Sequence, residues 1–185
     1  MLTLAWLALV LVLSMAYWAV GGLLFVAAGV VLAPLLPLEK SRAIGQRLLQ
    51  TAFRGFLGLL RLCGVFECEF RGFEALEGVS GGLIIAPNHP ALWDAVFVIA
   101  QVPGLRCILK SSLMHNPFLR GGAKLAGFIP NKPAHKMLQQ SIEALRQGDR
   151  LLFFPEGTRT RKQENPINTF LGGIGIIATQ SSAPV

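Results

Sequence analysis

The stretch that decides the fold is Leu83-Ile84-Ile85-Ala86-Pro87-Asn88-His89-Pro90-Ala91-Leu92-Trp93-Asp94. Its first four residues form a continuous apolar run, which is typical of a strand buried on both faces. Pro87 ends that run, and Pro90 suits the first position of a helix, where its missing N–H is not needed. The sequence therefore predicts a strand at 83–86, a turn, and an apolar helix over 91–100.

Strands and helices continue to alternate on both sides of this stretch. An alternation of apolar and charged residues predicts a half-buried strand at 66–71, followed by a glycine-rich connection. A helix with one apolar face is expected from Pro133 and ends at Gly148. This order favours an α/β fold with a mostly parallel sheet flanked by helices. Further strands are expected at 105–109, 128–130 and 151–154, and a loop with a short helix at 117–127.

Residues 1–38 contain no charged side chain, and we interpret them as a hydrophobic membrane anchor. A helix needs about 20 apolar residues to cross a bilayer core of about 30 Å, so the segment is nearly twice as long as necessary. Two arrangements fit: a hairpin broken at Gly21-Gly22, or one long helix that ends near Pro34. A cleaved signal peptide fits less well, because the segment lacks a basic start and its apolar run is too long.

Residues 39–64 mix leucine and phenylalanine with five basic residues. This pattern predicts a basic amphipathic helix in the membrane interface, and an ordinary docking helix with a solvated basic face is the alternative. Basic residues beside a membrane segment favour the cytoplasmic side and attract anionic headgroups. The net charge of +7 would also suit nucleic-acid binding, but no motif for it is recognised and the apolar anchor argues against it. The basic residues are Lys40, Arg42, Arg47, Arg54 and Arg61.

The three cysteines carry no visible chemistry. Cys63, Cys68 and Cys107 have neither an even count nor the paired spacing of a metal site. We expect thiols in a reducing compartment and no metal.

His89 and Asp94 are the first candidates for chemistry. On one ideal helix, residues five positions apart point about 140° away from each other, so both cannot face one point. They can meet if His89 lies in the turn before the helix and Asp94 lies on its first turns. Asp94 would then accept a hydrogen bond from one ring nitrogen and leave the other as a general base. The spacing alone is weak evidence, since a structural His and an exposed Asp give the same pattern.

A second motif, Phe153-Phe154-Pro155-Glu156-Gly157-Thr158-Arg159-Thr160, begins at the end of the strand expected at 151–154. Gly157 lets the backbone approach a ligand closely, and Thr158 can donate to anionic oxygens. Arg159 can hold a phosphate through two parallel hydrogen bonds. Glu156 would repel an anion, so we expect it to bind a hydroxyl or to pair with Arg159. The motif predicts a loop for an anionic, hydroxylated ligand, and a charged surface turn is the alternative.

Together the two motifs resemble the glycerophospholipid acyltransferase family, typified by 1-acyl-sn-glycerol-3-phosphate acyltransferase. That family has a His-x-x-x-x-Asp motif, usually preceded by an Asn such as Asn88, and then a Phe-Pro-Glu-Gly-Thr-Arg motif. Both are complete here, in the same order. The resemblance covers about residues 66–185, so we assign an acyltransferase domain to 65–185.

The resemblance implies membrane-associated transfer of a fatty acyl group from acyl-CoA or acyl carrier protein to a lysolipid hydroxyl. Lysophosphatidate is the first candidate acceptor. No cofactor is expected beyond the acyl donor, and the expected partners are the bilayer, the acceptor and the donor. We expect the active site at the cytoplasmic face of the cytoplasmic membrane. The implied catalytic residues are His89 and Asp94, and the implied substrate-binding residues are Asn88, Lys132, Glu156, Gly157, Thr158 and Arg159.

The chain departs from the family pattern in two places. Lysophosphatidate enzymes usually carry an Arg between the motifs that is thought to contact the acceptor phosphate. Here residues 127–133 offer only Lys132, which cannot form a bidentate fork. In the family's fourth block, Leu171 and Gly172 stand where a basic residue is expected. The chain also ends within that block, which is expected of a fragment or of a domain without its last strands.

Two alternatives follow from these departures. One is an acyltransferase for another acceptor, such as a lyso-aminolipid or a specialised glycolipid. The other is a catalytically inactive lipid-binding relative.

Overall fold

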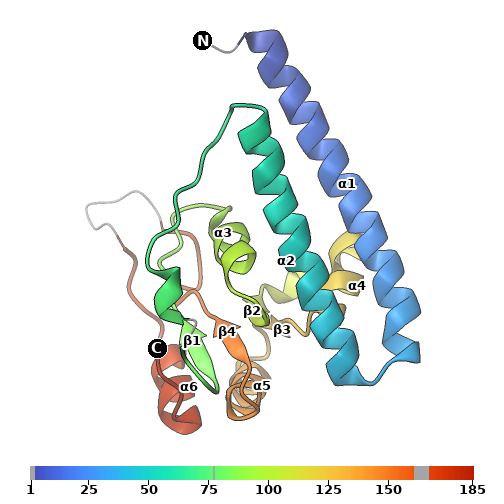
Figure 1. The fold of residues 1–185 in the computed structure, drawn as a ribbon. Coiled ribbons are helices and arrows are strands. Elements are labelled where there is room, and N and C mark those ends of the chain that lie inside the picture. Colours follow the sequence, from blue (N-terminus) through green and yellow to red (C-terminus); the bar gives the residue numbers. More distant parts are fainter. Residues whose placement is uncertain (1–2, 77, 161–166) are drawn as a thin grey trace.

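The computed structural model describes residues 3–76, 78–160 and 167–185. A sheet of four strands forms the centre, in the order β1-β4-β2-β3 (Figure 1). Every pair of neighbours is parallel, so all four strands end at the same edge of the sheet. The predicted α/β fold with a parallel sheet is confirmed. The strands are β1 Leu83–Ile85, β2 Leu105–Leu109, β3 Ile129–Pro130 and β4 Arg150–Leu152.

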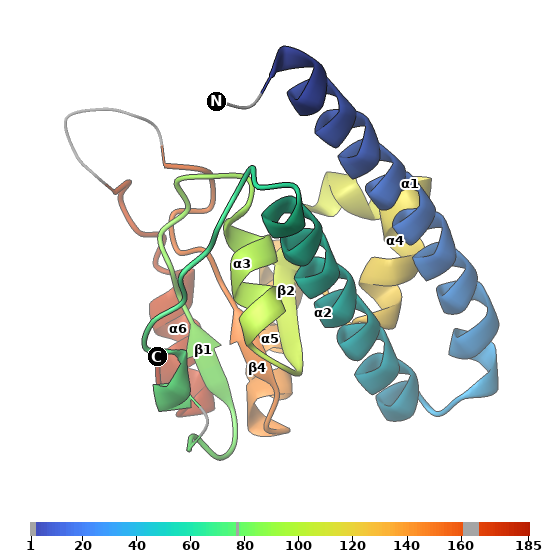
Figure 2. The same ribbon diagram turned by 45° about the horizontal axis from the view of Figure 1, so that its top comes forward.

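Helices cover both faces of this sheet (Figure 2). On one face, Leu151 of β4 packs in a core with α5 and α6. On the other, its neighbour Leu152 packs in a second core with α3 and α2. Because successive strand residues point to opposite faces, the short apolar strands fill both cores. The helices are α1 Leu4–Leu35, α2 Leu38–Leu62, α3 Asp94–Gln101, α4 Pro117–Leu125, α5 Ala134–Arg146 and α6 Gly173–Ser181.

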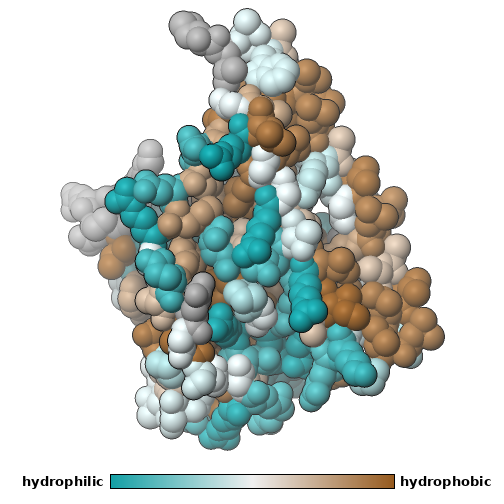
Figure 3. All heavy atoms as spheres, viewed as in Figure 1, coloured by the Kyte–Doolittle hydropathy of each residue, from teal (hydrophilic) through white to brown (hydrophobic). Residues whose placement is uncertain are grey.

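Helix α1 is one continuous helix, so of the two predicted arrangements the hairpin is wrong. Gly21 and Gly22 both lie within it, because each glycine costs a helix interior only about 1 kcal/mol. Pro34 lies in its last turn, where the long-helix alternative expected the end. Residues Leu4–Leu32 are long and apolar enough to cross a membrane. Most of this helix is exposed, and an apolar surface runs along it in Figure 3.

Helix α2 lies beside α1 and turns a polar stripe towards the sheet domain. The stripe consists of residues four positions apart, which share one face of a helix. On its other side, Phe56 and Leu60 pack against Val10 and Tyr17 of α1. The helix is therefore a docking helix between α1 and the domain, and its contact with lipid stays a prediction. The stripe's hydrogen bonds run from Arg42 to the Asp149 carboxylate, from Gln46 to the Ala126 carbonyl, and from Gln50 and Arg54 to the Ala100 carbonyl.

The strand predicted at 66–71 is not formed. Phe66 and Phe70 instead place their rings against Phe97 of α3, with ring centroids 5.8 and 6.5 Å apart. The alternation therefore anchors an irregular segment through its aromatic residues. No described strand pairs with this segment, so residues 66–71 have no neighbouring strand with which to form backbone hydrogen bonds.

Several boundaries also differ from the prediction: β1 ends at Ile85, and β4 spans Arg150–Leu152 rather than 151–154. Helix α3 begins at Asp94 rather than at residue 91, because residues 91–93 form a turn in which the Ala91 N–H donates to the Asp94 carboxylate. Pro90 therefore does not open the helix. Near the end of the chain, the Pro184 carbonyl accepts a hydrogen bond of 2.9 Å from the Ile84 N–H, beside β1. Gly148 follows α5 with a φ of 88°, as predicted for a C-terminal stop.

Candidate active site

The two motifs lie side by side because β1 and β4 are neighbours in the sheet. The first motif leaves the end of β1 and the second leaves the end of β4. The rings of His89 and Phe154 stack with centroids 4.1 Å apart and an interplanar angle of 21°. The candidate site therefore lies at the carboxyl edge of a parallel sheet, where α/β proteins usually bind their ligands.

His89 and Asp94 meet in the geometry that the sequence predicted. Nδ1 of His89 lies 2.8 Å from Oδ2 of Asp94, and the Ala91 N–H donates to the same oxygen at 2.8 Å. The His89 and Asp94 side chains are 18% and 14% exposed. Because a carboxylate accepts, Nδ1 donates to Asp94, and in the neutral tautomer of the ring Nε2 carries the lone pair. Among the described residues, none forms a hydrogen bond with Nε2, so that nitrogen is available to a substrate.

Glu156 joins the two motifs. Its side chain is almost fully buried, with 4% of the residue exposed. One carboxylate oxygen accepts from the His89 N–H at 2.9 Å, and the other accepts from the Asn168 N–H at 3.1 Å. The Thr160 hydroxyl lies 2.7 Å from both oxygens and donates to the carboxylate. The carboxylate thus holds the backbone of His89 against the second loop.

These hydrogen bonds also set the ionisation of Glu156. Burial alone would raise the pKa of its carboxyl group. The donors Thr160, His89 and Asn168 outweigh burial, so the pKa of Glu156 lies below its ordinary value. The group is therefore a carboxylate at neutral pH, as three donors require.

The second loop is fixed by its backbone as well. The Thr160 N–H donates to the His89 carbonyl at 2.6 Å, and the Leu171 N–H donates to the Pro155 carbonyl at 2.8 Å. Gly157 has a φ of 65°, a conformation that residues with a Cβ rarely adopt. A Cβ at this position would also clash with the Leu171 side chain. Gly157 is therefore required by the turn itself.

The structure distributes the other predicted binding residues unequally. Asn88, Thr158 and Arg159 are exposed at the same edge as His89. Lys132 is also exposed, but it follows β3, which lies three strands away from β1. At about 4.8 Å per strand, this is roughly 14 Å along the sheet. Lys132 is thus not brought next to His89.

Sequence reasoning missed three residues of this edge. Thr160 and Asn168 bind Glu156, and Lys110 is exposed where β2 ends, one strand closer to His89 than Lys132 is. Lys110 could have been found from its position directly after a predicted strand. Thr160 and Asn168 carry no comparable signal.

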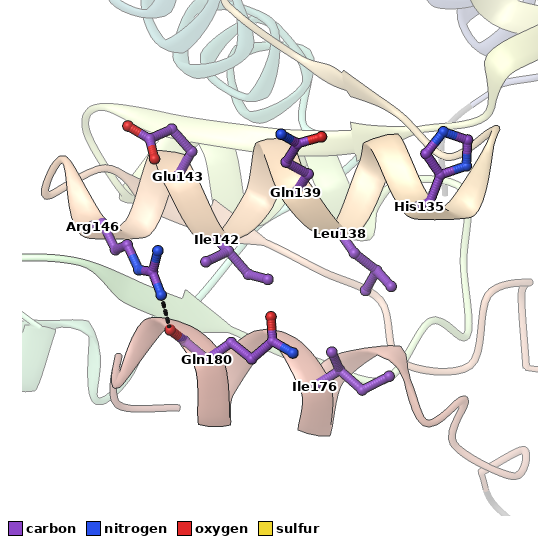
Figure 4. A pocket seen from close by; sticks show the side chains of 8 residues that line it. All are labelled: His135, Leu138, Gln139, Ile142, Glu143, Arg146, Ile176 and Gln180. Carbon is purple, nitrogen blue, oxygen red and sulfur yellow. Dashed lines mark hydrogen bonds between the residues drawn. The ribbon is translucent and has the colours of Figure 1, made fainter.

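Other features lie away from this edge. Ser80 belongs to a Gly-x-Ser-x-Gly pattern at 78–82, but these residues precede β1, so Ser80 does not sit on the strand-to-helix turn of a hydrolase nucleophile. A shallow cavity of about 400 Å³ lies between α5 and α6, where Leu138 and Ile142 face α6 and Arg146 donates to the Gln180 carbonyl (Figure 4). None of the motif residues lines it. Within the described residues, no group of three or more His, Cys, Asp or Glu side chains could hold a metal ion.

Comparisons with known proteins agree with this geometry. The chain is 28% identical over 134 residues to a 1-acyl-sn-glycerol-3-phosphate acyltransferase from Pseudomonas aeruginosa, which covers 69% of this chain and 50% of that protein. It is 23% identical over 125 residues to a chloroplastic 1-acyl-sn-glycerol-3-phosphate acyltransferase from Brassica napus, covering 65% and 36%. The chain thus spans half or less of the length of these relatives.

A solved structure shares the fold. The crystal structure of the 1-acyl-sn-glycerophosphate acyltransferase PlsC from Thermotoga maritima matches with a TM-score of 0.70 and 19% identity, over 93% of this chain and 70% of that one. The sequence model of the acyltransferase family matches residues 67–185, which contain both motifs. The chain therefore belongs to the acyltransferase family, together with the 1-acyl-sn-glycerol-3-phosphate acyltransferases.

Proposed function

We propose that this protein transfers a fatty acyl group from acyl-CoA or acyl carrier protein to the hydroxyl of a lysolipid. The observation that carries the proposal is the His89–Asp94 pair, whose 2.8 Å contact occupies Nδ1 and leaves Nε2 without a described partner. This is the arrangement that a general base needs. The buried link through Glu156 holds the base beside the acceptor loop.

In the proposed reaction, the acyl group passes directly from the donor to the acceptor. Nε2 of His89 takes the proton of the acceptor hydroxyl while the hydroxyl oxygen attacks the thioester carbonyl carbon. Asp94 stabilises the resulting imidazolium through Nδ1. The carbon–sulfur bond then breaks, and the departing thiolate takes the proton back from Nε2. The products are the acylated lipid and the free thiol, and no acyl-enzyme is required.

Lysophosphatidate is the first candidate acceptor. The relatives are named for 1-acyl-sn-glycerol-3-phosphate, and exposed cations at the carboxyl edge suit a phosphate monoester. Arg159 lies in the loop that follows β4, and Lys110 directly follows the neighbouring strand β2. We infer that these two residues bind the acceptor phosphate. Lys132 follows β3, too far along the sheet from His89 to be the main phosphate ligand.

A second class of acceptor is favoured by one observation. No Arg lies in the stretch 127–133, where lysophosphatidate enzymes usually carry one. Lys110 and Lys132 offer only point charges. A lyso-aminolipid or a glycolipid acceptor would not need a second bidentate contact.

We also propose that α1 holds the protein against the bilayer and does not cross it. Contacts along α1 run from Trp6, whose indole donates to the Cys63 carbonyl, to Gly29, which packs on Gly121 of α4. If α1 crossed the hydrocarbon, α2 beside it would cross as well, and α2 carries basic residues along its whole length. Burying them there is costly. We therefore infer that the exposed face of α1 lies in one leaflet, with the active site on the cytoplasmic side.

The test is acyl transfer by detergent-purified protein. Lysophosphatidate, lyso-aminolipid and lysoglycolipid acceptors are each combined with acyl-CoA and with acyl carrier protein donors. We expect one acceptor class to be acylated by the wild type and not by His89→Ala. Folded protein that acylates none of the acceptors would contradict the proposal, and so would His89→Ala with wild-type activity.

A further inference from the structure

We propose that the groove between the start of α2 and α5 is a second anion site, which binds a phosphate group. Its cavity has a volume of about 790 Å³, and its lining includes Leu38, Arg42, Arg106, Phe128 and Lys136. The groove runs from Arg106, near the amino edge of the sheet, to Pro130, the last residue of β3, and so lies on the far side of the sheet from β1 and His89. Arg106 is the second residue of β2, whose five residues separate the two edges by roughly 13 Å.

The groove holds more positive than negative charge in a partly buried position. Arg42 and Arg106 both direct Nη1 at the same oxygen of Asp149, Oδ2, at 3.3 and 2.9 Å. Their side chains are only 17% and 12% exposed. One carboxylate cannot neutralise two guanidinium groups, so one charge stays uncompensated where water solvates it poorly.

A further pair of charged residues lines the groove. Lys136 adds a third cation, and it is exposed at the first turns of α5. Glu143 is the acid of the lining, and its carboxylate accepts from the Gln147 amide at 2.7 Å. Counting Asp149, three cations face two carboxylates, so the groove keeps a net charge of +1.

The two guanidinium groups also retain unused donors. Nε of Arg42 is buried and has no partner among the described residues. Nε of Arg106 donates to the Gly127 carbonyl and Nη1 to Asp149, and none of the described residues accepts from Nη2 of either arginine. Phosphate oxygens match this planar fork geometry, and two converging guanidinium groups favour a phosphate over a single carboxylate.

Removing Asp149 separates this proposal from a purely structural ion pair. If phosphate binds the two arginines, it competes with the Asp149 carboxylate for the same donors. In Asp149→Asn, inorganic phosphate should therefore bind about tenfold more tightly than in the wild type and restore the thermal midpoint that the substitution lowers. If the arginines only fasten α2 to the sheet, phosphate will bring no such recovery.

The experiment measures thermal unfolding and equilibrium dialysis of the full chain in detergent, with inorganic phosphate as the probe and chloride at equal ionic strength as its control. The double variant Lys110→Gln/Arg159→Gln removes the two cations that we infer bind the acceptor phosphate. We expect it to keep the response to phosphate. Lys136→Gln should weaken phosphate binding by about tenfold. Lys40→Gln is the matched control, because it removes an exposed cation of α2 that does not line the groove.

A lipid arm distinguishes the source of the phosphate group. Vesicles of phosphatidylcholine, with and without phosphatidylglycerol, are sedimented with the wild type, Lys136→Gln and Lys40→Gln. A loss of binding specific to Lys136→Gln and to anionic vesicles assigns a lipid headgroup, and a response to inorganic phosphate alone assigns a soluble ligand. The proposal is overturned if neither probe depends on Lys136, or if the response to phosphate disappears in Lys110→Gln/Arg159→Gln and persists in Lys136→Gln.

Discussion

The two edges of the sheet use charged groups in opposite ways. At the carboxyl edge, Asp94 and Glu156 accept mainly from backbone N–H groups, a ring nitrogen and a hydroxyl, and Arg159 is left exposed. At the amino edge, Arg42 and Arg106 are held by the Asp149 carboxylate. The comparison indicates that the fold fixes its reactive loops with neutral donors and reserves ion pairs for fastening a helix. The first arrangement leaves cations free for a substrate.

The largest effect is expected at the carboxyl edge. His89→Ala should lower kcat by about 10²–10⁴-fold, since it removes the proposed general base. The thermal midpoint should change little, because the ring is partly exposed and its backbone contacts persist. Acyl-transfer kinetics check the first expectation and thermal unfolding the second. His135→Ala is the matched control: His135 is exposed on α5, which follows β3, the strand three places from β1, and its loss should leave kcat unchanged.

The next effect tests how Glu156 acts. Glu156→Gln should lower kcat by about 10–100-fold, because an amide cannot accept from all three donors and His89 shifts from its position. KM for the acceptor should stay within about twofold if Glu156 only positions the base. A rise in KM with an unchanged kcat would instead return Glu156 to the acceptor-binding role that the sequence suggested.

Asp149→Ala should lower the stability of the fold and leave the rate of acyl transfer unchanged. In phosphate-free buffer we expect the free energy of unfolding to fall by about 1–3 kcal/mol, because two partly buried guanidinium groups lose their partner. kcat per folded molecule should remain at the wild-type level. Denaturant titration and steady-state kinetics on the same sample test this. An equal loss of kcat would show that the two edges are not independent.

The smallest expected effect concerns the stability of the fold at acid pH. The pKa of Glu156 is lowered in the folded protein, so its carboxylate stabilises the fold above the ordinary pKa of 4.5, and that stability is lost as the pH falls below this value. Glu156→Gln lacks this group and should lose less stability than the wild type between neutral pH and acid. Thermal midpoints measured across this range compare the two. Parallel curves would exclude Glu156 as a contributor to acid sensitivity.

Much of the fold could be predicted because its signals are local. The sequence predicted strands at 83–86 and 105–109, which the structure has at Leu83–Ile85 and Leu105–Leu109, and Gly148 predicted the end of α5. The segment 66–71 was wrong because alternation records which side chains are buried, not whether a neighbouring strand exists. The choice between a hairpin and one helix for α1 could not be made, since Gly21-Gly22 permits a break without requiring it.

The candidate site was predictable in part for the same reason. The contact between His89 and Asp94 follows from a turn and a helix start within one short segment. The role of Glu156 depends on β1 lying next to β4, an order that no local pattern contains. The polar stripe of α2 is visible in the sequence, but a stripe does not say whether it faces lipid headgroups or a protein domain.

The shared carboxylate of Glu156 has a consequence for local unfolding. Loops normally belong to the least stable part of a protein and open independently of one another. Here the His89 and Asn168 N–H groups bind one buried acceptor, so neither loop can open without weakening the other. The turn that carries His89 and the loop after β4 should therefore become disordered together, in one opening event. With His89 as the proposed general base, a partly opened molecule would lack a positioned base, and it would spare the proposed acyl donor from attack by water.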